Sequence, residues 1–306
     1  MPLLTLTGMS KDRTTAFVLS GGASLGAIHV GMLRSLYERG IVPDFIVATS
    51  AGALNGAFIA TRPQTAETAD DLGRIWRGIR RDQVFPVSPL KGLLGLLGSY
   101  NHLVSDSGLR GLVARHLAGG RLEQLPLPLH MVAVDPLTGQ ELLLSAGSLR
   151  KAVMASSSIP GVLPPVRWEG RDLIDGAVAN DTPLSHAVEL GAHDIYVLST
   201  GHACALQEPP RGALEMALHA VSLLVHRRLV RDLDDYAGKA HVVVLPPPCP
   251  LSITPIDFDH ASELIQRAYT DACEFLDGGG AMRLPIRMHP HRHRTQEGAD
   301  HRCAGP

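Results

Sequence analysis

The chain has 306 residues, 45% of them hydrophobic, which is enough for one large core or two modest ones. Its formal net charge of -2 at pH 7 offers no basic field for nucleic acid and no acidic excess typical of disorder. The cysteines (Cys204, Cys249, Cys273 and Cys303) are far apart and form no CxxC pair, which argues against a structural zinc site and a disulfide framework.

The sequence contains no recognisable targeting or membrane-spanning segment. Residues 1–15 lack the positively charged start, apolar run and cleavage site of a signal peptide. The most apolar stretch, residues 41–60, includes Asp44 and Asn55, and a membrane-spanning helix needs about 20 predominantly apolar residues. We therefore expect a cytoplasmic protein, and peripheral contact with a membrane surface stays open.

Predicted strands alternate with predicted helices along the chain. Short apolar runs predict buried strands at residues 16–19, 45–48, 130–134, 195–198 and 242–245, with 141–144 returning from a hairpin turn. Helical patterns cover residues 26–39, 51–60, 65–77, 183–190, 213–236 and 261–276. The alternation predicts an α/β fold, a three-layer α/β/α arrangement with a central, mainly parallel sheet. We expect one domain over residues 1–282 and a flexible tail rich in His, Arg and Pro over 283–306.

Ser50 lies between a predicted buried strand and a helix of small residues. The local sequence is Ala48-Thr49-Ser50-Ala51-Gly52, close to the G-x-S-x-G pattern of a nucleophile elbow. A sharp strand-to-helix turn exposes the serine hydroxyl, and the residues two before and two after must be small to avoid a collision. Ala48 adds one methyl group to the glycine pattern, whereas Gly52 fits it. The alternative interpretation is a serine that only caps a helix.

A glycine-rich loop, Ser20 to Gly26, follows the first predicted strand. Glycines there let backbone N–H groups approach a ligand oxygen, and a helix N-terminus favours negative charge. One use of such a loop is a dinucleotide fingerprint, but that pattern requires glycine where Ala23 stands. The other is an oxyanion hole, which needs only two or three aligned N–H groups. A third possibility is a glycine turn that simply packs.

Two further segments carry candidate residues. Asp175 begins an Asp-Gly turn in the run Leu173 to Pro183, and residues 155–166 contain three consecutive serines and three prolines. Either segment alone is a weak signal, because an Asp-Gly turn is also common in plain loops.

Taken together, the four segments resemble the patatin-like phospholipase family over residues 15–278. That family has a glycine-rich oxyanion loop, a G-x-S-x-G elbow, an A-S-x-x-x-P segment and a D-G-[GA] motif, and all four occur here in that order. The resemblance implies Ser50 as nucleophile and Asp175 as its dyad partner. It also implies an oxyanion hole from the backbone of Gly21, Gly22 and Ala23.

Three positions depart from the family pattern. They are Ala48 in the elbow, Ala23 in place of a third glycine, and Leu25 in place of an arginine or lysine. Since Leu25 removes a positive charge near the loop, the resemblance implies acyl transfer without specifying a phosphate-bearing substrate.

The expected activity is hydrolysis of a lipid ester through an acyl-enzyme, with a lipid or acyl ester as partner and with no cofactor, metal or nucleic acid. The alternatives are a soluble carboxylesterase, thioesterase or acyltransferase acting on small acyl groups, a nucleotide-binding domain, and a catalytically silent lipid-binding scaffold. A Ser-His-Asp triad using His241 or His260 is rejected, because only one strand precedes the elbow. His29, on the first predicted helix, is interpreted as structural.

Two weaker signals complete the sequence. Residues 89–97 are rich in leucine and glycine and fit either a lid, a membrane-docking helix or an ordinary core helix. The tail contains His289, His291, His293 and His301, which are interpreted as a solvated segment rather than a metal site.

Overall fold

The computed structural model describes residues 13–86, 100–206 and 208–278. Three of the predictions above therefore lie wholly or largely outside the described residues: the absence of a signal peptide, the role of residues 89–97, and the character of the tail over 283–306 with its four histidines.

The centre of the fold is an eight-stranded sheet in the order β5-β6-β3-β2-β1-β7-β8, with β4 also paired to β3. The strands are β1 Thr15–Leu19, β2 Phe45–Ala48, β3 Leu129–Val134, β4 Glu141–Leu144, β5 Val166–Trp168, β6 Arg171–Asp175, β7 Asp194–Leu198 and β8 His241–Leu245. Neighbouring strands in the series β3-β2-β1-β7-β8 pair in parallel. Strands β4 and β6 pair antiparallel with β3, and β5 pairs antiparallel with β6. The predicted mainly parallel sheet is confirmed.

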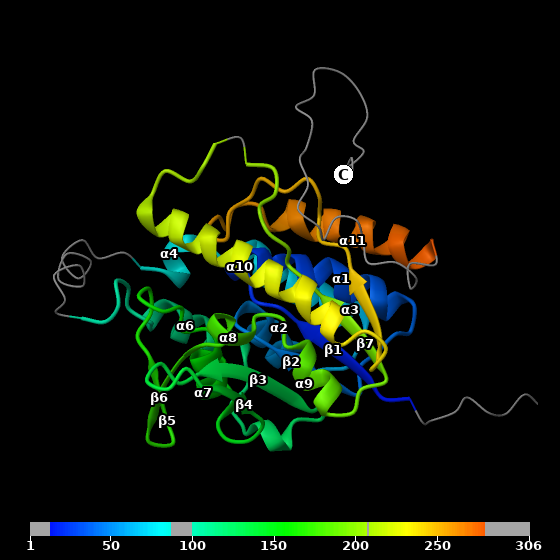
Figure 1. Cartoon of the computed structure of the whole chain (residues 1–306), viewed down its shortest axis with the longest axis horizontal. Helices are drawn as coiled ribbons and strands as arrows, with labels where there is room; N and C mark the ends of the chain where they lie inside the picture. Colours follow the sequence, from blue (N-terminus) through cyan, green and yellow to red (C-terminus); the bar gives the residue numbers. More distant parts are fainter. Residues whose placement is uncertain (1–12, 87–99, 207, 279–306) are drawn as a thin grey trace, which may run out of the picture.

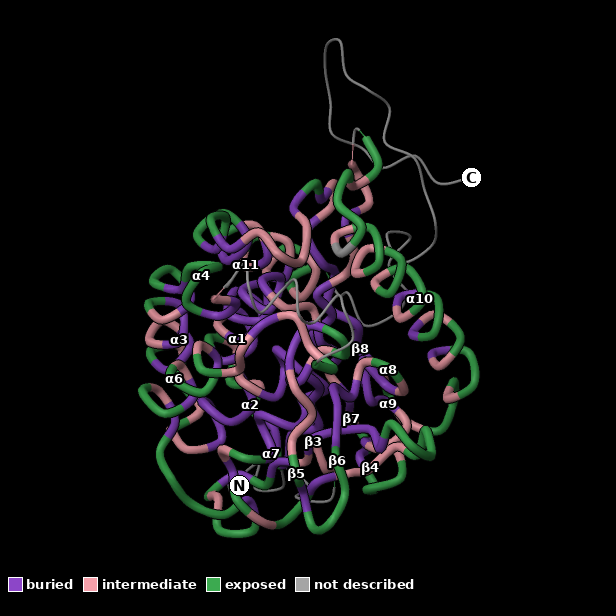
Figure 2. The backbone as a smooth tube through the Cα atoms, turned by 90° about the vertical axis from the view of Figure 1, so that its left-hand side faces the viewer, coloured by how far each residue is buried: buried purple, intermediate pink, exposed green. Residues whose placement is uncertain are grey.

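Helices cover both faces of this sheet (Figures 1 and 2). They are η1 Ala23–Ala27, α1 Ile28–Glu38, α2 Ala51–Ala60, α3 Ala66–Gly78, α4 Arg81–Val84, α6 Ser107–His116, η2 Leu122–Gln124, α7 Leu149–Ser156, α8 Ala177–Asn180, α9 Leu184–Glu189, α10 Ala213–Asp235 and α11 Ala261–Asp277. Figure 2 shows α1, α3 and α11 on one side of the buried strands and α9 and α10 on the other. The predicted three-layer α/β/α arrangement is therefore present. Among the described residues, no helix is both long and apolar enough to span a bilayer.

Alternation along the strands divides the core into two parts. Side chains point to opposite faces of a strand in turn, so Phe17 and Leu19 belong to the larger cluster and Ala16 and Val18 to the smaller one. The larger cluster packs under α1, α2, α3, α7 and α11, and the smaller one under α9 and α10. Because both faces are buried, these strands are continuous apolar runs, which is why they were predictable.

Strand β6 occupies the place beside β3 that β2 leaves free. Ala48, the last residue of β2, pairs with Met131 of β3. Further along the same edge of β3, Ala133 pairs with Asp175, and β4 takes the opposite edge. Since β2 turns away at the elbow, β6 enters antiparallel in its place. Asp175 therefore lies next to the turn that contains Ser50, although 125 residues separate the two in the sequence.

Candidate active site

Ser50 stands at a sharp turn between β2 and α2. Its backbone has φ 53° and ψ -119°, in the left-handed region that non-glycine residues rarely adopt. Such a conformation costs of order 1–3 kcal/mol and persists only where the surroundings fix it. Gly52 is part of that fixation, because a Cβ there would lie 2.3 Å from the carbonyl oxygen of Leu19. The strand, the turn and the helix are those that the sequence predicted around Ser50.

The hydroxyl of Ser50 donates a hydrogen bond to the carboxylate of Asp175. The Oγ–Oδ2 distance is 2.6 Å, and both residues are buried, with exposed fractions of 6% and 2%. The other carboxylate oxygen, Oδ1, accepts from the backbone N–H of Ala177 at 2.9 Å. These bonds orient the Asp175 carboxylate toward Ser50 from the end of β6. The structure thus brings together the two residues that the sequence analysis paired.

Three consecutive serines at the C-terminal end of α7 form hydrogen bonds with the backbone of Ser50 and Asp175. Ser156 Oγ accepts from the backbone N–H of Ser50 at 3.0 Å, and Ser157 Oγ donates to the Ser50 carbonyl oxygen at 3.1 Å. The backbone carbonyl of Ser158 accepts from the N–H of Asp175 at 2.9 Å. Hydrogen bonds to both the N–H and the carbonyl oxygen of Ser50 therefore hold the strained turn. The serine run is apparent in the sequence, but the roles of its individual residues could not be predicted there.

The site contains a second buried carboxyl group, Asp181, which lies after α8. Burial raises the pKa of Asp175 from 3.8 to about 7, against the opposing effect of its hydrogen bonds from Ser50 and Ala177. Burial, and after it the nearby charge of Asp175, raise the pKa of Asp181 from 3.8 to about 7. Asp181 was not singled out from the sequence, where it appears only as one polar residue in a predicted loop.

The glycine-rich loop lies between Asp181 and the segments that follow β7. Gly21 donates its N–H to the backbone oxygen of Asp181 at 3.1 Å, and Gly21 O accepts from Thr200 Oγ1 at 2.6 Å. A Cβ on Gly21 would lie 2.2 Å from Asp181 Oδ1, and one on Gly22 would lie 2.5 Å from Thr200 Oγ1. Gly22, with its φ of 144°, therefore requires glycine, whereas a side chain at position 21 would have to displace the Asp181 carboxylate. Since the Gly21 amide already has a partner, the backbone amides of Gly22 and Ala23 are the better candidates to face a ligand.

The backbone after Gly21 adopts unusual dihedral angles that turn it toward Ser50. Gly22 has φ 144° and Ala23 has φ 49°, and Ala23 lines the same cavity as Ser50. One residue further, Ser24 donates its N–H to the carbonyl of Pro255 and its hydroxyl to that of Thr254. Ala23 thus occupies a left-handed position usually taken by glycine, consistent with the glycine that the family pattern has there.

Asn55, buried on α2, links the loop to the neighbouring helices. Its Nδ2 donates to the carbonyl of Gly26 at 2.9 Å and lies 3.1 Å from His29 Nδ1, while its Oδ1 accepts from Trp76 Nε1 at 2.8 Å. Burial lowers the pKa of His29 to about 3, so this imidazole is neutral. His29 therefore belongs to a structural polar network, as its interpretation from the sequence stated.

The other histidines considered for a triad have surface partners. His241 Nδ1 lies 2.9 Å from Asp194, and His260 forms pairs with Asp257 and Glu263. Their side chains are 44% and 45% exposed, unlike the buried Ser50. Within the described ranges, no group of three or more His, Cys, Asp or Glu residues is arranged to hold a metal ion.

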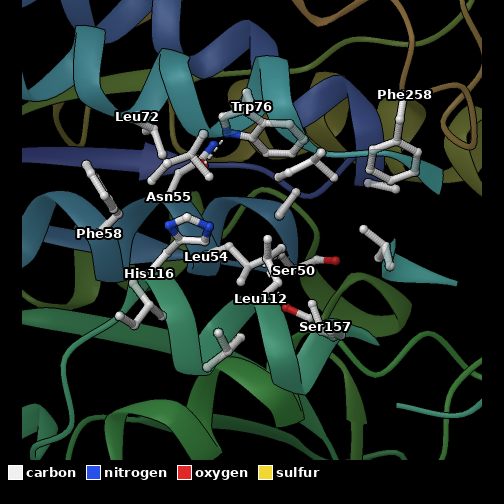
Figure 3. Close-up of a pocket in the computed structure, with 18 of the residues that line it drawn as sticks. Ser50, Leu54, Asn55, Phe58, Leu72, Trp76, Leu112, His116, Ser157 and Phe258 are labelled. Carbon is white, nitrogen blue, oxygen red and sulfur yellow. Dashed lines mark hydrogen bonds between the residues drawn. The ribbon is translucent and has the colours of Figure 1, made fainter. Parts of the chain in front are cut away.

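An apolar cavity opens beside Ser50 between α2, α3 and α6. Figure 3 shows Ser50 and Ser157 toward one end of it and Phe58 and His116 toward the other. Most of its wall is hydrocarbon, contributed by Ala23, Ala51, Leu54, Phe58, Leu72, Ile75, Trp76, Ile79, Val84, Phe85, Leu109, Leu112, Val113, Leu117, Ile159, Leu163 and Phe258. The side chains from α6 were not predicted, because that helix was not recognised in the sequence. A long hydrocarbon group is the ligand that such a wall suits.

The fold and this site define a class of protein: an α/β/α domain with a hydroxyl–carboxylate pair at the carboxyl edge of its parallel strands, an arrangement suited to nucleophilic acyl transfer. The patatin-like phospholipase family model matches residues 17–188, more than half of the chain. The chain therefore belongs to the patatin-like phospholipase family.

Related proteins are much longer than the segment that they share with this chain. Patatin-like phospholipase domain-containing protein 7 of Mus musculus is 29% identical over 198 residues, which are 64% of this chain and 14% of that protein. An uncharacterised NTE family protein of Mycobacterium bovis is 31% identical over 183 residues, which are 60% of this chain and 47% of that protein. The chain thus spans less than half the length of either relative.

Solved structures with a similar arrangement are distant in sequence. VipD from Legionella pneumophila aligns at 12% identity with a TM-score of 0.41, covering 88% of this chain and 67% of that one. Human GIVD cytosolic phospholipase A2, in complex with methyl gamma-linolenyl fluorophosphonate, aligns at 11% identity with a TM-score of 0.41, covering 90% of this chain and 60% of that one.

Proposed function

We propose that this protein is a lipid acyl hydrolase that cleaves carboxylic esters through a Ser50–Asp175 dyad and an acyl-enzyme. The observation that carries the proposal is the 2.6 Å hydrogen bond from Ser50 Oγ to Asp175 Oδ2, at one end of an apolar cavity. A nucleophile within hydrogen-bond reach of its base is the first geometric requirement of covalent catalysis. The apolar cavity favours a lipid over the small acyl groups of the alternative hypothesis.

In the proposed reaction, Ser50 Oγ attacks the ester carbonyl carbon and its proton passes to Asp175 Oδ2. An ordinary aspartate, with a pKa near 3.8, is a weak base at neutral pH. Burial raises the pKa of Asp175 to about 7, which brings its basicity close to that of a typical general base. The alcohol then leaves with the proton from Asp175, and the acyl group stays on Ser50. Water, deprotonated by Asp175, hydrolyses the acyl-enzyme and restores the free hydroxyl.

The negative charge that develops on the carbonyl oxygen needs hydrogen-bond donors. We assign this role to the backbone N–H groups of Gly22 and Ala23, because the Gly21 amide donates to Asp181. The N-terminus of α2, which begins at Ala51, adds a favourable dipole at the nucleophile. Removal of one oxyanion donor typically slows an enzyme about 10²–10³-fold, so the loop contributes on the scale of a catalytic side chain.

Covalent labelling with a fluorophosphonate, mapped by mass spectrometry, tests the proposal. We expect the label on Ser50 in the wild type and no label in Ser50→Ala. Ser222→Ala is the matched control, since the Ser222 hydroxyl donates to the His219 carbonyl within its own helix. Failure to label the wild type, or equal labelling of Ser50→Ala, would exclude Ser50 as the nucleophile.

A further inference from the structure

The floor of the apolar cavity is one face of helix α2. Leu54 and Phe58 follow Ser50 at intervals of four residues, and all three line the cavity. Residues four apart lie on the same side of an α-helix. Eight residues at 1.5 Å each put the α-carbon of Phe58 about 12 Å along the helix axis from that of Ser50.

The far end of the cavity is closed by an end wall, which we define as Phe58 and His116. The Phe58 ring is fixed from behind by Arg62, whose guanidinium carbon lies 3.7 Å from the ring centroid. Arg62 Nη1 also donates to the Phe58 carbonyl at 2.8 Å, and Nη2 donates to the His116 carbonyl at 3.5 Å. Arg62 therefore joins the C-terminal ends of α2 and α6 and restrains the Phe58 ring, which is only 4% exposed.

A polar hollow lies on the other side of the end wall. Phe58 and His116 line both spaces, as do the apolar residues Ile75, Ile79 and Leu112. The hollow is otherwise bordered by Arg62, Asp71, Arg74, Gly78, Gln83 and Arg115. A hydrocarbon that extended past the wall would displace water from guanidinium groups without replacing their hydrogen bonds, which is unfavourable. The length of hydrocarbon that fits the apolar cavity is thus limited by the polar hollow as well as by the side chains of the end wall.

From these contacts we infer that the site is selective for a single medium-length acyl chain, and that Phe58 sets the upper limit of its length. The inference rests on the proposed function, because it requires the acyl carbon to lie at Ser50. About 12 Å of helix face accommodates an extended chain of about ten carbons. Up to that length each buried methylene strengthens transition-state binding about fourfold; longer chains must bend or displace the end wall.

The test is the specificity constant kcat/KM for p-nitrophenyl esters with acyl chains from four to sixteen carbons. For the wild type we expect a maximum near ten carbons and at least a tenfold lower value at sixteen. Phe58→Ala and the milder Phe58→Leu should raise the ratio of kcat/KM at sixteen carbons to kcat/KM at ten carbons, the first by about tenfold. Leu54→Phe, halfway along the floor, should move the maximum to shorter chains.

Phe258→Ala is the matched control. Phe258 lines the same cavity, but Figure 3 shows it toward the Ser50 end and away from Phe58. This variant should change kcat/KM by a similar factor for every chain length, so the ratio between sixteen and ten carbons should stay the same. A wild-type profile that keeps rising to sixteen carbons, or a ratio shifted equally by Phe258→Ala and Phe58→Ala, would overturn the inference.

Binding to Ser50→Ala separates this inference from the proposed function. Decanoate and hexadecanoate are titrated calorimetrically against Ser50→Ala and against Ser50→Ala with Phe58→Ala. We expect at least tenfold tighter binding of decanoate in the first protein and a smaller difference in the second. That outcome would support the length limit even if no ester were hydrolysed, whereas equal affinities in the first protein would refute it.

Discussion

Replacement of Asp175 by asparagine is expected to abolish ester hydrolysis and to stabilise the folded protein above neutral pH. Asparagine has nearly the same shape and can still accept the hydrogen bond from the Ala177 N–H. It has no carboxylate to desolvate, and desolvation is the main cause of the raised pKa of Asp175. The burial that raises the pKa of Asp175, and with it the basicity that the proposed mechanism uses, therefore costs folding free energy.

The size and sign of the effect follow from proton linkage. The pKa of Asp175 is about 7 in the folded protein, and its ordinary value is 3.8. Between these pH values the folded state keeps a proton that the unfolded chain releases, so wild-type stability falls as pH rises from 4 to 7. This shift corresponds to about 4 kcal/mol. Asp175→Asn does not lose this stability as pH rises. Its unfolding free energy should therefore exceed that of wild type only slightly near pH 4 and by up to about 4 kcal/mol at pH 8.

Urea unfolding of both proteins at pH 4.5, 6 and 8 measures this difference. Asp172→Asn is the control, since Asp172 is on the same strand with a side chain that is 52% exposed. Its unfolding free energy should stay within about 0.5 kcal/mol of wild type at each pH. The reasoning would be refuted if Asp175→Asn were no more stable than wild type at pH 8, or if the difference in unfolding free energy did not vary with pH. Either result would mean that burial does not penalise the charged form of Asp175. The assignment of its raised basicity would then be wrong.

Other consequences of the site geometry can be measured separately. In the proposed mechanism Asp175 must be deprotonated to act as the base, so kcat/KM should rise about tenfold per pH unit below its pKa of about 7 and level off above it. Ser50→Gly and Ser50→Ala should both be inactive, but Gly should be more stable to urea by about 1 kcal/mol, because only glycine tolerates φ 53° without strain; equal stabilities would refute a strained elbow. Gly52→Ala should lower the unfolding free energy by about 3 kcal/mol, because its Cβ would meet the Leu19 carbonyl. Gly111→Ala, on a helix with open space around it, should instead be neutral or stabilising.

The parts of the fold that were predictable are those with strong local patterns. The strand before Ser50 is a continuous apolar run, and the helix after it consists of small residues. The structure places that helix at Ala51–Ala60, with the bounds that the sequence indicated. The four segments of the family pattern also predicted that Asp175 pairs with Ser50, and the structure places the two within hydrogen-bond distance.

The parts that were missed depend on contacts between distant segments. Strand β6 begins with Arg171 and Asp172, so no apolar run marks it, and the sequence indicated only the Asp-Gly turn at its end. Its position is determined by the edge of β3 that β2 vacates. Helix α6 was missed because only Leu109 and Val113 are buried in it, too few for a clear helical pattern. The apolar cavity could not be predicted for the same reason, since α6 forms one of its walls.

Helix α2 carries the Ser50 hydroxyl just before its first residue and the Phe58 ring in its last turn. Both positions therefore belong to one short rigid body, and fluctuations that displace the helix move them together. The distance from the Ser50 hydroxyl to the Phe58 ring is then fixed by this helix, whereas the width of the cavity depends on the walls from α3 and α6. Under the proposed function, single exchanges at positions 54 or 58 would change the preferred chain length while the elbow stayed intact.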